Sequence, residues 1–434
     1  MAQIRGFSFL IILLLFSTAI QAIPDKEINW QEEINGQEEI NWQEEISGLK
    51  RELNVRHVDL FFSRDSLSFC RELDLVAEQA SGKSVLEIAV ELQQVVATLG
   101  DPNTVVNYHY HIDTKLILPF ECYWFEEGIY VMKYWKDFEA LAGKRLVSIN
   151  NFPIQQVIDS LSTLISGATP AMVRSVIPRM ITWTQILDHF GFAEESMFHI
   201  EVENLEGKST TLAIELPTAE TEHIKFQPKI LPLGWEDTKT YFRDSLLLED
   251  QLYYIQYNKC WSRETEVDYG SGASALFMPS FKEFEKKVLK RAKKNDINKL
   301  VFDLRFNNGG QPLQFSSFIS KLKKTGIEKQ ATVYLILGRK TSSAAMINAM
   351  DVINIFDAVS VGENTGGRPN HFTGVKRFVM TTSNLIVSYS TEYVTLIEGN
   401  PESLSPSIPA AENFMEYMLG IDPGLEAVRK HSPH

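Results

Sequence analysis

Two adjacent serines, Ser342 and Ser343, stand at a place in the chain where a hydroxyl group could act as a nucleophile. They follow a short apolar segment, 333–337, that is typical of a strand, and precede an apolar segment, 344–350, that is typical of a helix. The first N–H groups of a helix have no partner within it and favour negative charge nearby. A serine there could attack a carbonyl group, or it could simply cap the helix, which is its commonest task at such a position.

A second turn, about 35 residues upstream, could stabilise the negative charge that such an attack creates. The segment 301–304 is typical of a buried strand and leads through Asn307 and Asn308 into Gly309 and Gly310. Glycines allow backbone N–H groups to face a ligand without a side chain in the way, as an oxyanion hole requires. Taken alone, a strand that ends in two glycines is more often a plain tight turn.

A third segment, 362–365, reads Gly-Glu-Asn-Thr and follows the serine turn at a short distance. In this order, the segments 303–310, 341–345 and 362–365 resemble the motifs of the tail-specific, or C-terminal-processing, serine peptidases. The resemblance covers about residues 245–425 well and residues 50–220 more loosely. It implies an α/β domain of the crotonase/ClpP-like type and hydrolysis of peptide bonds through an acyl-enzyme.

The resemblance also implies roles for individual residues. Ser343 would be the nucleophile, and its choice over Ser342 depends on its spacing to Glu363 in the family pattern. The backbone N–H groups of Ala344 and of Gly309 or Gly310 would form the oxyanion hole.

The chain departs from the family pattern at the residue that should act as general base. Family members typically carry a lysine 25 residues after the nucleophile, and that position is Arg368 here. A buried lysine can lose its proton and accept the serine's proton, whereas arginine stays protonated. Arg368 could instead bind a peptide carboxylate through its two parallel N–H groups, or it could be a solvated surface residue.

A second departure removes another base. The segment 99–104 resembles the family's Asp-x-His-Thr motif, but Asn103 occupies the histidine position. Histidine is the usual general base near neutral pH, so each remaining histidine near a motif is a candidate, although a structural or exposed role is commoner. The candidate bases are His371, His109 and His111, with Lys376 as a less well placed alternative.

The composition of the chain excludes several other classes of function. Of its 434 residues, 44% are apolar and 11% aromatic, which is typical of a globular protein. A net charge of −14 disfavours nucleic acid as a partner, because phosphate backbones bind basic surfaces. The three cysteines, Cys70, Cys122 and Cys260, lack metal-ligand spacing, and no phosphate-binding glycine loop is present. The sequence therefore predicts neither a metal nor an organic cofactor.

The N-terminal region predicts export. Residues 1–22 combine Arg5 with an apolar run and small residues, the pattern of a cleaved secretory signal, and we expect a periplasmic or extracellular protein with no stable membrane insertion. Residues 23–49 repeat an acidic hexapeptide, Glu-Ile-Asn-Trp-Gln-Glu, whose period fits neither a helix nor one strand face. We expect this segment to be an acidic linker without a fixed fold.

Three further units are expected after this linker. Residues 50–110 have apolar residues at helical spacing and predict a helical module, and residues 111–230 predict a β-rich module that resembles a PDZ domain. Residues 245–434 alternate strands with helices and predict an α/β domain, with strands near 253–256, 300–304, 333–337, 358–361 and 385–388.

Two functions fit these patterns. The first is an exported serine peptidase that acts on peptides or the C-termini of unfolded proteins through Ser343. The alternative is a catalytically inactive relative that keeps the fold and binds peptide C-termini, with Arg368 as the carboxylate clamp.

Overall fold

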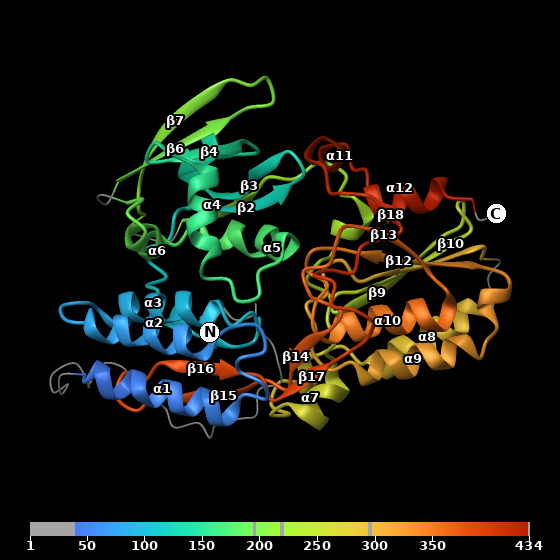
Figure 1. Cartoon of the computed structure of the whole chain (residues 1–434). Coiled ribbons are helices and arrows are strands. Elements are labelled where there is room, and N and C mark those ends of the chain that lie inside the picture. Colours follow the sequence, from blue (N-terminus) through green and yellow to red (C-terminus); the bar gives the residue numbers. More distant parts are fainter. Residues whose placement is uncertain (1–39, 194–196, 218–220, 294–296, 433–434) are drawn as a thin grey trace, which may run out of the picture.

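The computed structural model describes residues 40–193, 197–217, 221–293 and 297–432 and arranges them as helices around four sheets (Figure 1). The predicted signal segment and the first hexapeptide repeats lie outside the described residues. Within the described ranges, no helix is long and apolar enough to cross a bilayer.

Three helices open the described chain, and they confirm the helical spacing seen in the sequence. Their apolar residues line one side and enter a shared core, as an amphipathic helix requires. These helices are α1 (Trp42–Arg56), α2 (Ser66–Glu78) and α3 (Val85–Ala97).

Helix α1 begins inside the segment that we expected to be an unfolded linker, so that expectation is wrong for residues 42–49. The Asn41 side chain accepts a hydrogen bond from the backbone N–H of Glu44 and caps the helix. Ile46 and Leu49 then continue a buried helical stripe that the six-residue period concealed. Glu45, also buried, accepts hydrogen bonds from the backbone N–H groups of Thr382 (2.8 Å) and Ser383 (2.6 Å).

Strands from the far end of the chain complete this helical region. A small antiparallel sheet has the order β1-β16-β15, and Figure 1 shows it beside α1. Its strands are β1 (Val105–Val106), β15 (Lys376–Val379) and β16 (Ile386–Tyr389). The strand expected near 385–388 therefore exists, but it is not part of the α/β sheet to which we assigned it.

The β-rich region is an antiparallel sheet with the order β2-β3-β4-β6-β7, to which β5 and β8 add at β4 and β3. Strands β6 and β7 form a hairpin with Gly207 at its turn. The strands are β2 (Phe120–Phe125), β3 (Gly128–Trp135), β4 (Arg145–Ile149), β5 (Phe152–Pro153), β6 (Met197–Glu203), β7 (Ser209–Glu215) and β8 (His223–Lys225). Three helices accompany this sheet: α4 (Ile154–Ser162), α5 (Pro170–Met180) and α6 (Thr184–His189).

The third region is a six-stranded sheet with the order β18-β13-β12-β11-β10-β9, parallel except for β9. Four of its strands were expected from the sequence: β10 (Leu252–Tyr257), β11 (Lys299–Asp303), β12 (Thr332–Leu337) and β13 (Val359–Gly362). The edge strands β9 (Phe242–Leu247) and β18 (Ile408–Pro409) were not. The mixed α/β class is thus confirmed, whereas the PDZ-like and crotonase-like assignments stay predictions.

Helices cover both faces of this sheet, so its strands are buried on both sides (Figure 1). Along β12, Val333 and Leu335 enter the core under one layer of helices, and Tyr334 and Ile336 enter the core on the other face. The first layer contains α8 (Phe281–Ala292), α9 (Leu313–Lys323) and α10 (Ala344–Phe356), and α12 (Pro423–Lys430) covers the other face. The remaining elements include α7 (Arg263–Tyr269), α11 (Phe414–Met418), β14 (His371–Thr373) and β17 (Glu392–Val394).

The segments 303–310, 341–345 and 362–365 all follow the carboxyl ends of these parallel strands. β11 leads into the Gly-Gly turn, β12 leads into the serine turn, and β13 leads towards Arg368. Parallel strands end at one edge of a sheet, and this is where ligands bind in open α/β folds.

A buried ion network holds this edge to the C-terminal part of the chain. Arg305, only 5% exposed, bonds with its guanidinium to Asp303 (2.9 Å), Glu412 (2.7 Å) and Asp422 (2.9 Å). The Tyr254 hydroxyl donates a further hydrogen bond to Asp303 at 2.6 Å. Because three carboxylates share one buried cation, its removal would leave them without a counter-charge.

We therefore expect Arg305→Leu to lower the free energy of unfolding by about 3–5 kcal/mol, because it leaves buried carboxylates unpaired. Arg429→Leu is the matched control, since Arg429 pairs with Asp250 and Glu426 at the surface, and we expect a loss below about 1 kcal/mol. Urea titration of both variants measures the difference. Equal losses would show that the Arg305 network contributes no more than a surface pair.

Candidate active site

Ser343 has a backbone conformation that a residue other than glycine rarely adopts. Its φ is 53° and its ψ is −128°, directly before the first residue of α10. Its side chain makes no capping hydrogen bond, and its hydroxyl has no hydrogen bond to any described residue. The simple capping role therefore does not apply to Ser343. Strained positions of this kind are concentrated at functional sites.

The turn before Ser343 is fixed by buried hydrogen bonds. The Thr341 hydroxyl donates to the backbone oxygen of Leu304 (2.9 Å) and accepts the N–H of Gly338 (3.2 Å). The Ser342 hydroxyl lies 3.3 Å from the Lys340 backbone oxygen. The two serines are thus distinguished: Ser342 bonds to the backbone, and Ser343 is free.

The Gly-Gly turn lies directly against Ser343. A Cβ atom on Gly309 would stand 2.9 Å from the Cβ of Ser343, 3.1 Å from its Oγ and 3.2 Å from the N of Ala344. A Cβ on Gly310 would meet the Cys260 backbone oxygen at 2.4 Å. Both glycines also have positive φ, 109° and 129°. A side chain at either position would therefore strain the backbone and clash with its neighbours.

Asn307 determines the direction of one amide in this turn. Its side chain, fully buried, donates to the Tyr257 backbone oxygen (2.8 Å) and accepts the N–H of Gly309 (2.9 Å). The N–H groups of Gly310 and Ala344 donate to no described residue. The donors left free beside Ser343 are therefore those of Gly310 and Ala344.

Arg368 makes no hydrogen bond to the Ser343 hydroxyl. Its Nη2 lies 3.7 Å from Oε1 of Glu402, and its Nε is buried without an acceptor. Gly367, just before it, packs against Ser342, where an added Cβ would come within 2.7 Å of the Cα. The arginine thus sits near the serine turn but shares its charge with a carboxylate of this chain.

His371, at the start of β14, is 8% exposed and has one unused nitrogen. Its Nδ1 lies 3.1 Å from the Pro369 backbone oxygen and donates to it, while Nε2 is buried and has no partner. Burial lowers the pKa of His371 below its ordinary value of 6.5. The imidazole is therefore neutral near pH 7, with a free lone pair on Nε2, although no hydrogen bond joins it to Ser343.

The other candidate bases are held elsewhere. His109 lies in a 3₁₀ turn (Tyr108–His111), where its ring is 4.3 Å from that of Tyr110 and burial lowers its pKa to about 4. Burial also lowers the pKa of His111 in the same turn. Lys376 is exposed at the start of β15. None of the three is hydrogen-bonded to Ser343.

Asn103, in the position of the family histidine, donates to the backbone oxygen of Phe372 at 2.7 Å and so lies beside His371. A buried His57–Asp101 pair, with Nε2 and Oδ2 3.0 Å apart, packs there too, with the His57 ring 5.1 Å from that of Phe372. The sequence reasoning missed His57 because it belongs to no motif. Its Nδ1 accepts the Asp59 N–H, so both nitrogens are occupied.

The position of Gly309 predicts a strong steric effect on substitution. We expect Gly309→Ala to lower the free energy of unfolding by about 1–3 kcal/mol more than Gly272→Ala, because the new methyl group must displace Ser343. Gly272 is the control, since its φ of 74° is also positive but nothing lies within 4 Å of its Cβ position. Urea denaturation compares the two, and equal losses would contradict the packing described here.

The buried histidines predict a pH dependence of stability. Because their pKa values are lower in the folded than in the unfolded state, the unfolded chain binds more protons as the pH falls below about 6.5. Stability should therefore rise with pH between about 5 and 7. His371→Gln should reduce this slope of stability against pH. His109→Gln should reduce it over a range that extends down to about pH 4. An unchanged slope in both variants would contradict the burial of these rings.

Comparisons with known proteins bear on the fold. No protein-family profile matches the chain, and no curated protein sequence matches it. Solved structures do match. Mature CPAF complexed with lactacystin has a TM-score of 0.62 and 12% identity, covering 90% of this chain and 97% of that one. A structure of mature CPAF without this compound in its description has a TM-score of 0.60 and 12% identity. The match covers 90% of this chain and 96% of that one.

The photosystem II D1 C-terminal processing protease matches over 89% of this chain and 99% of its own, at 12% identity and a TM-score of 0.39. The structural likeness to CPAF spans both the motif-bearing sheet and the N-terminal regions, and at 12% identity it concerns the fold alone. The chain therefore shares the fold of mature CPAF, and its three motifs resemble those of the tail-specific serine peptidases.

Proposed function

We propose that this protein is an exported serine peptidase that cleaves peptides, or the C-termini of unfolded proteins, through an acyl-enzyme on Ser343. The observation that carries the proposal is the strained Ser343 with its free hydroxyl, set at the start of α10 against Gly309. The half-buried hydroxyl has no hydrogen-bond partner among the described residues, and the backbone strain at Ser343 serves no evident capping purpose.

The surroundings supply groups for each step of acyl transfer. Ser343 Oγ attacks the peptide carbonyl and its proton passes to a base, which then protonates the leaving amine. Water later hydrolyses the ester and restores the hydroxyl. The free N–H groups of Ala344 and Gly310 are the candidate donors to the tetrahedral oxyanion. Gly309 would join them only by releasing Asn307.

His371 is the best candidate for the base. It is neutral near pH 7, its Nδ1–H is held by Pro369, and its Nε2 is an unused acceptor inside the protein. Arg368 cannot take this role because its guanidinium keeps its proton. The proposal requires His371 and Ser343 to come within hydrogen-bond reach when substrate is bound.

The second candidate function is peptide binding without catalysis. It is favoured by one observation: among the described residues, no basic nitrogen is hydrogen-bonded to the Ser343 hydroxyl. The same fold would then hold a peptide that is never cleaved, with Arg368 as a candidate carboxylate clamp. Export remains part of both proposals and is supported by the signal-like pattern of residues 1–22.

Labelling with a fluorophosphonate probe distinguishes the two functions, because only an activated serine reacts with it. We expect the protein to gain one probe adduct by intact mass, Ser343→Ala to gain none, and Ser342→Ala to react as the wild type does. His371→Gln should slow labelling at least 100-fold if His371 is the base. A folded protein that does not label would refute the peptidase proposal and support peptide binding.

A further inference from the structure

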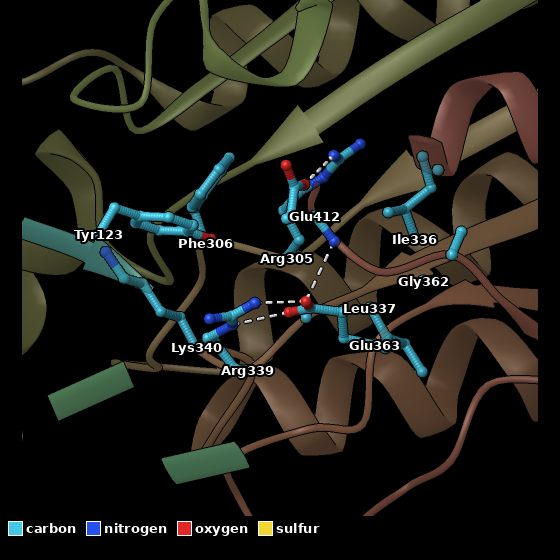
Figure 2. A pocket seen from close by; sticks show the side chains of 13 residues that line it. Tyr123, Arg305, Phe306, Ile336, Leu337, Arg339, Lys340, Gly362, Glu363 and Glu412 are labelled. Carbon is cyan, nitrogen blue, oxygen red and sulfur yellow. Dashed lines mark hydrogen bonds and ion pairs between the residues drawn. The ribbon is translucent and has the colours of Figure 1, made fainter. Parts of the chain in front are cut away.

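Two basic side chains on the strand β15 have no partner among the described residues. Several other cations of this fold lie beside carboxylates, as Figure 2 shows for Arg339, whose Nε is 2.8 Å from Oε2 of Glu363. Lys376 and Arg377, by contrast, are exposed and make no hydrogen bond or ion pair with a described side chain. Because the whole chain has a net charge of −14, two adjacent cations on one strand form a local site that attracts negative charge.

The backbone of the same strand has an open edge. β15 lies at the end of the order β1-β16-β15, so only one of its sides is paired. Val379 stands opposite Ile386, whose backbone oxygen points away from β15 and accepts the N–H of Asn107 at 2.9 Å. Opposite residues of an antiparallel pair direct their backbone groups outwards together, at every second position. The N–H and C=O groups of Val379 and Arg377 therefore face the open edge, where no described residue bonds to them.

The side chains at this edge fit an acidic strand with one apolar face. Val379 is 50% exposed, and Arg377 points to the same side of the strand, whereas Phe378 packs on the other side against the helical core. An open edge accepts a further strand through its backbone groups. Basic residues at an edge discourage pairing with another basic strand, but they favour a strand of opposite charge.

The segment that precedes α1 has this composition. Residues 27–38 are two acidic hexapeptides with four glutamates and no basic residue. Six is three times the period of a strand, so Ile28, Trp30 and Ile34 would share one face of an extended chain. Glu32 interrupts that face, and for this reason the pattern alone predicts no strand. Beside Arg377 the same glutamate would gain a counter-charge.

The chain also brings this segment to the same sheet. Glu45 of α1 accepts the N–H groups of Thr382 and Ser383, which lie in the turn between β15 and β16. The chain before α1 therefore ends beside this turn, and β15 runs towards the same turn. β15 has four residues, so its length is about 13 Å, whereas residues 27–38 span up to about 40 Å when extended. The segment can thus lie along β15 in the same direction.

We propose that residues 27–38 add a parallel strand to the open edge of β15 and extend the three-stranded sheet to four strands. The N–H and C=O groups of Arg377 and Val379 would bond to the new strand. Its apolar face would cover Val379, and its glutamates would pair with Lys376 and Arg377. The inference goes beyond the peptidase proposal and does not depend on the chemistry of Ser343.

Hydrogen–deuterium exchange of single amides, measured by mass spectrometry with electron-transfer fragmentation, tests the added strand. The comparison variant replaces residues 27–38 by glycines and serines of equal length. We expect the amides of Arg377 and Val379 to exchange at least about tenfold more slowly in the full chain than in this variant, because paired amides are protected. The amide of Phe378 faces β16 and is the internal reference, which should not change.

A variant of unchanged composition separates strand pairing from attraction between charges. The combined changes Ile28→Asn, Asn29→Ile, Trp30→Gln and Gln31→Trp keep every charge but move two apolar residues to the face opposite Ile34. We expect this variant to lose the protection, because side chains alternate between the faces of a strand. Protection equal to that of the wild type would show that no defined strand face is bound, and it would overturn the proposal.

On the side of the sheet, Arg377→Glu places a like charge against the glutamates. We expect the Val379 amide to return to the fast rate in this variant. Lys324→Glu is the matched control, since Lys324 is an exposed residue at the end of α9 and gives the same change in net charge. It should keep the protection, and an equal loss in both variants would mean that net charge, and not the edge of β15, is responsible.

The same strand could also come from a second copy of the chain. Protection within one chain does not depend on protein concentration, so it should be the same at about 1 µM and about 100 µM. Protection that appears only at the higher concentration, together with a dimer in sedimentation velocity, would overturn the assignment to the same chain. Equal exchange of both edge amides in the full chain and in the glycine-serine variant would overturn the proposal as a whole.

Discussion

The buried guanidinium of Arg305 is the interaction on which the geometry of the site depends. It lies just after β11 and binds Asp303, Glu412 and Asp422, so it fixes both the strand end and two positions of the C-terminal segment. Burial raises the pKa of Glu412, and Arg305 opposes that rise. Without the cation these carboxylates would be buried charges without compensation, and the edge of the sheet could not keep this shape.

The network extends from this cation to the β-rich sheet. The backbone N–H of Glu412 donates to Glu363 at 3.2 Å, and Glu363 forms an ion pair with Arg339. Arg339 in turn donates to the backbone oxygen of Trp124 in β2. The turn that carries Lys340 and Ser343 is thus placed between two parts of the molecule by buried charges, which permit little displacement.

The sequence revealed the parts of this arrangement that depend on local patterns. Buried strands β10 to β13, the glycines at 309 and 310 and the serine turn follow from apolar runs and turn residues. It did not reveal that β16 pairs with β1, just over 280 residues away, because long-range pairing leaves no local period. The direction of the Gly309 amide was hidden for the same kind of reason, since it depends on the buried side chain of Asn307.

Two features of this conformation stand against peptide cleavage: the Gly309 N–H is bonded to Asn307, and no base is bonded to the Ser343 hydroxyl among the described residues. The missing base is the greater obstacle. The hydrogen bond from Gly309 to Asn307 is a neutral one, with a net contribution of about 1 kcal/mol, whereas a donor to an oxyanion contributes about 3–4 kcal/mol. A developing oxyanion could therefore take the Gly309 N–H from Asn307. Nothing comparable compensates for a missing base, because Ser343 is a weak nucleophile while its hydroxyl keeps its proton. The approach of His371 Nε2 to Ser343, more than the shape of the oxyanion hole, therefore decides between the two proposed functions, peptide cleavage and peptide binding.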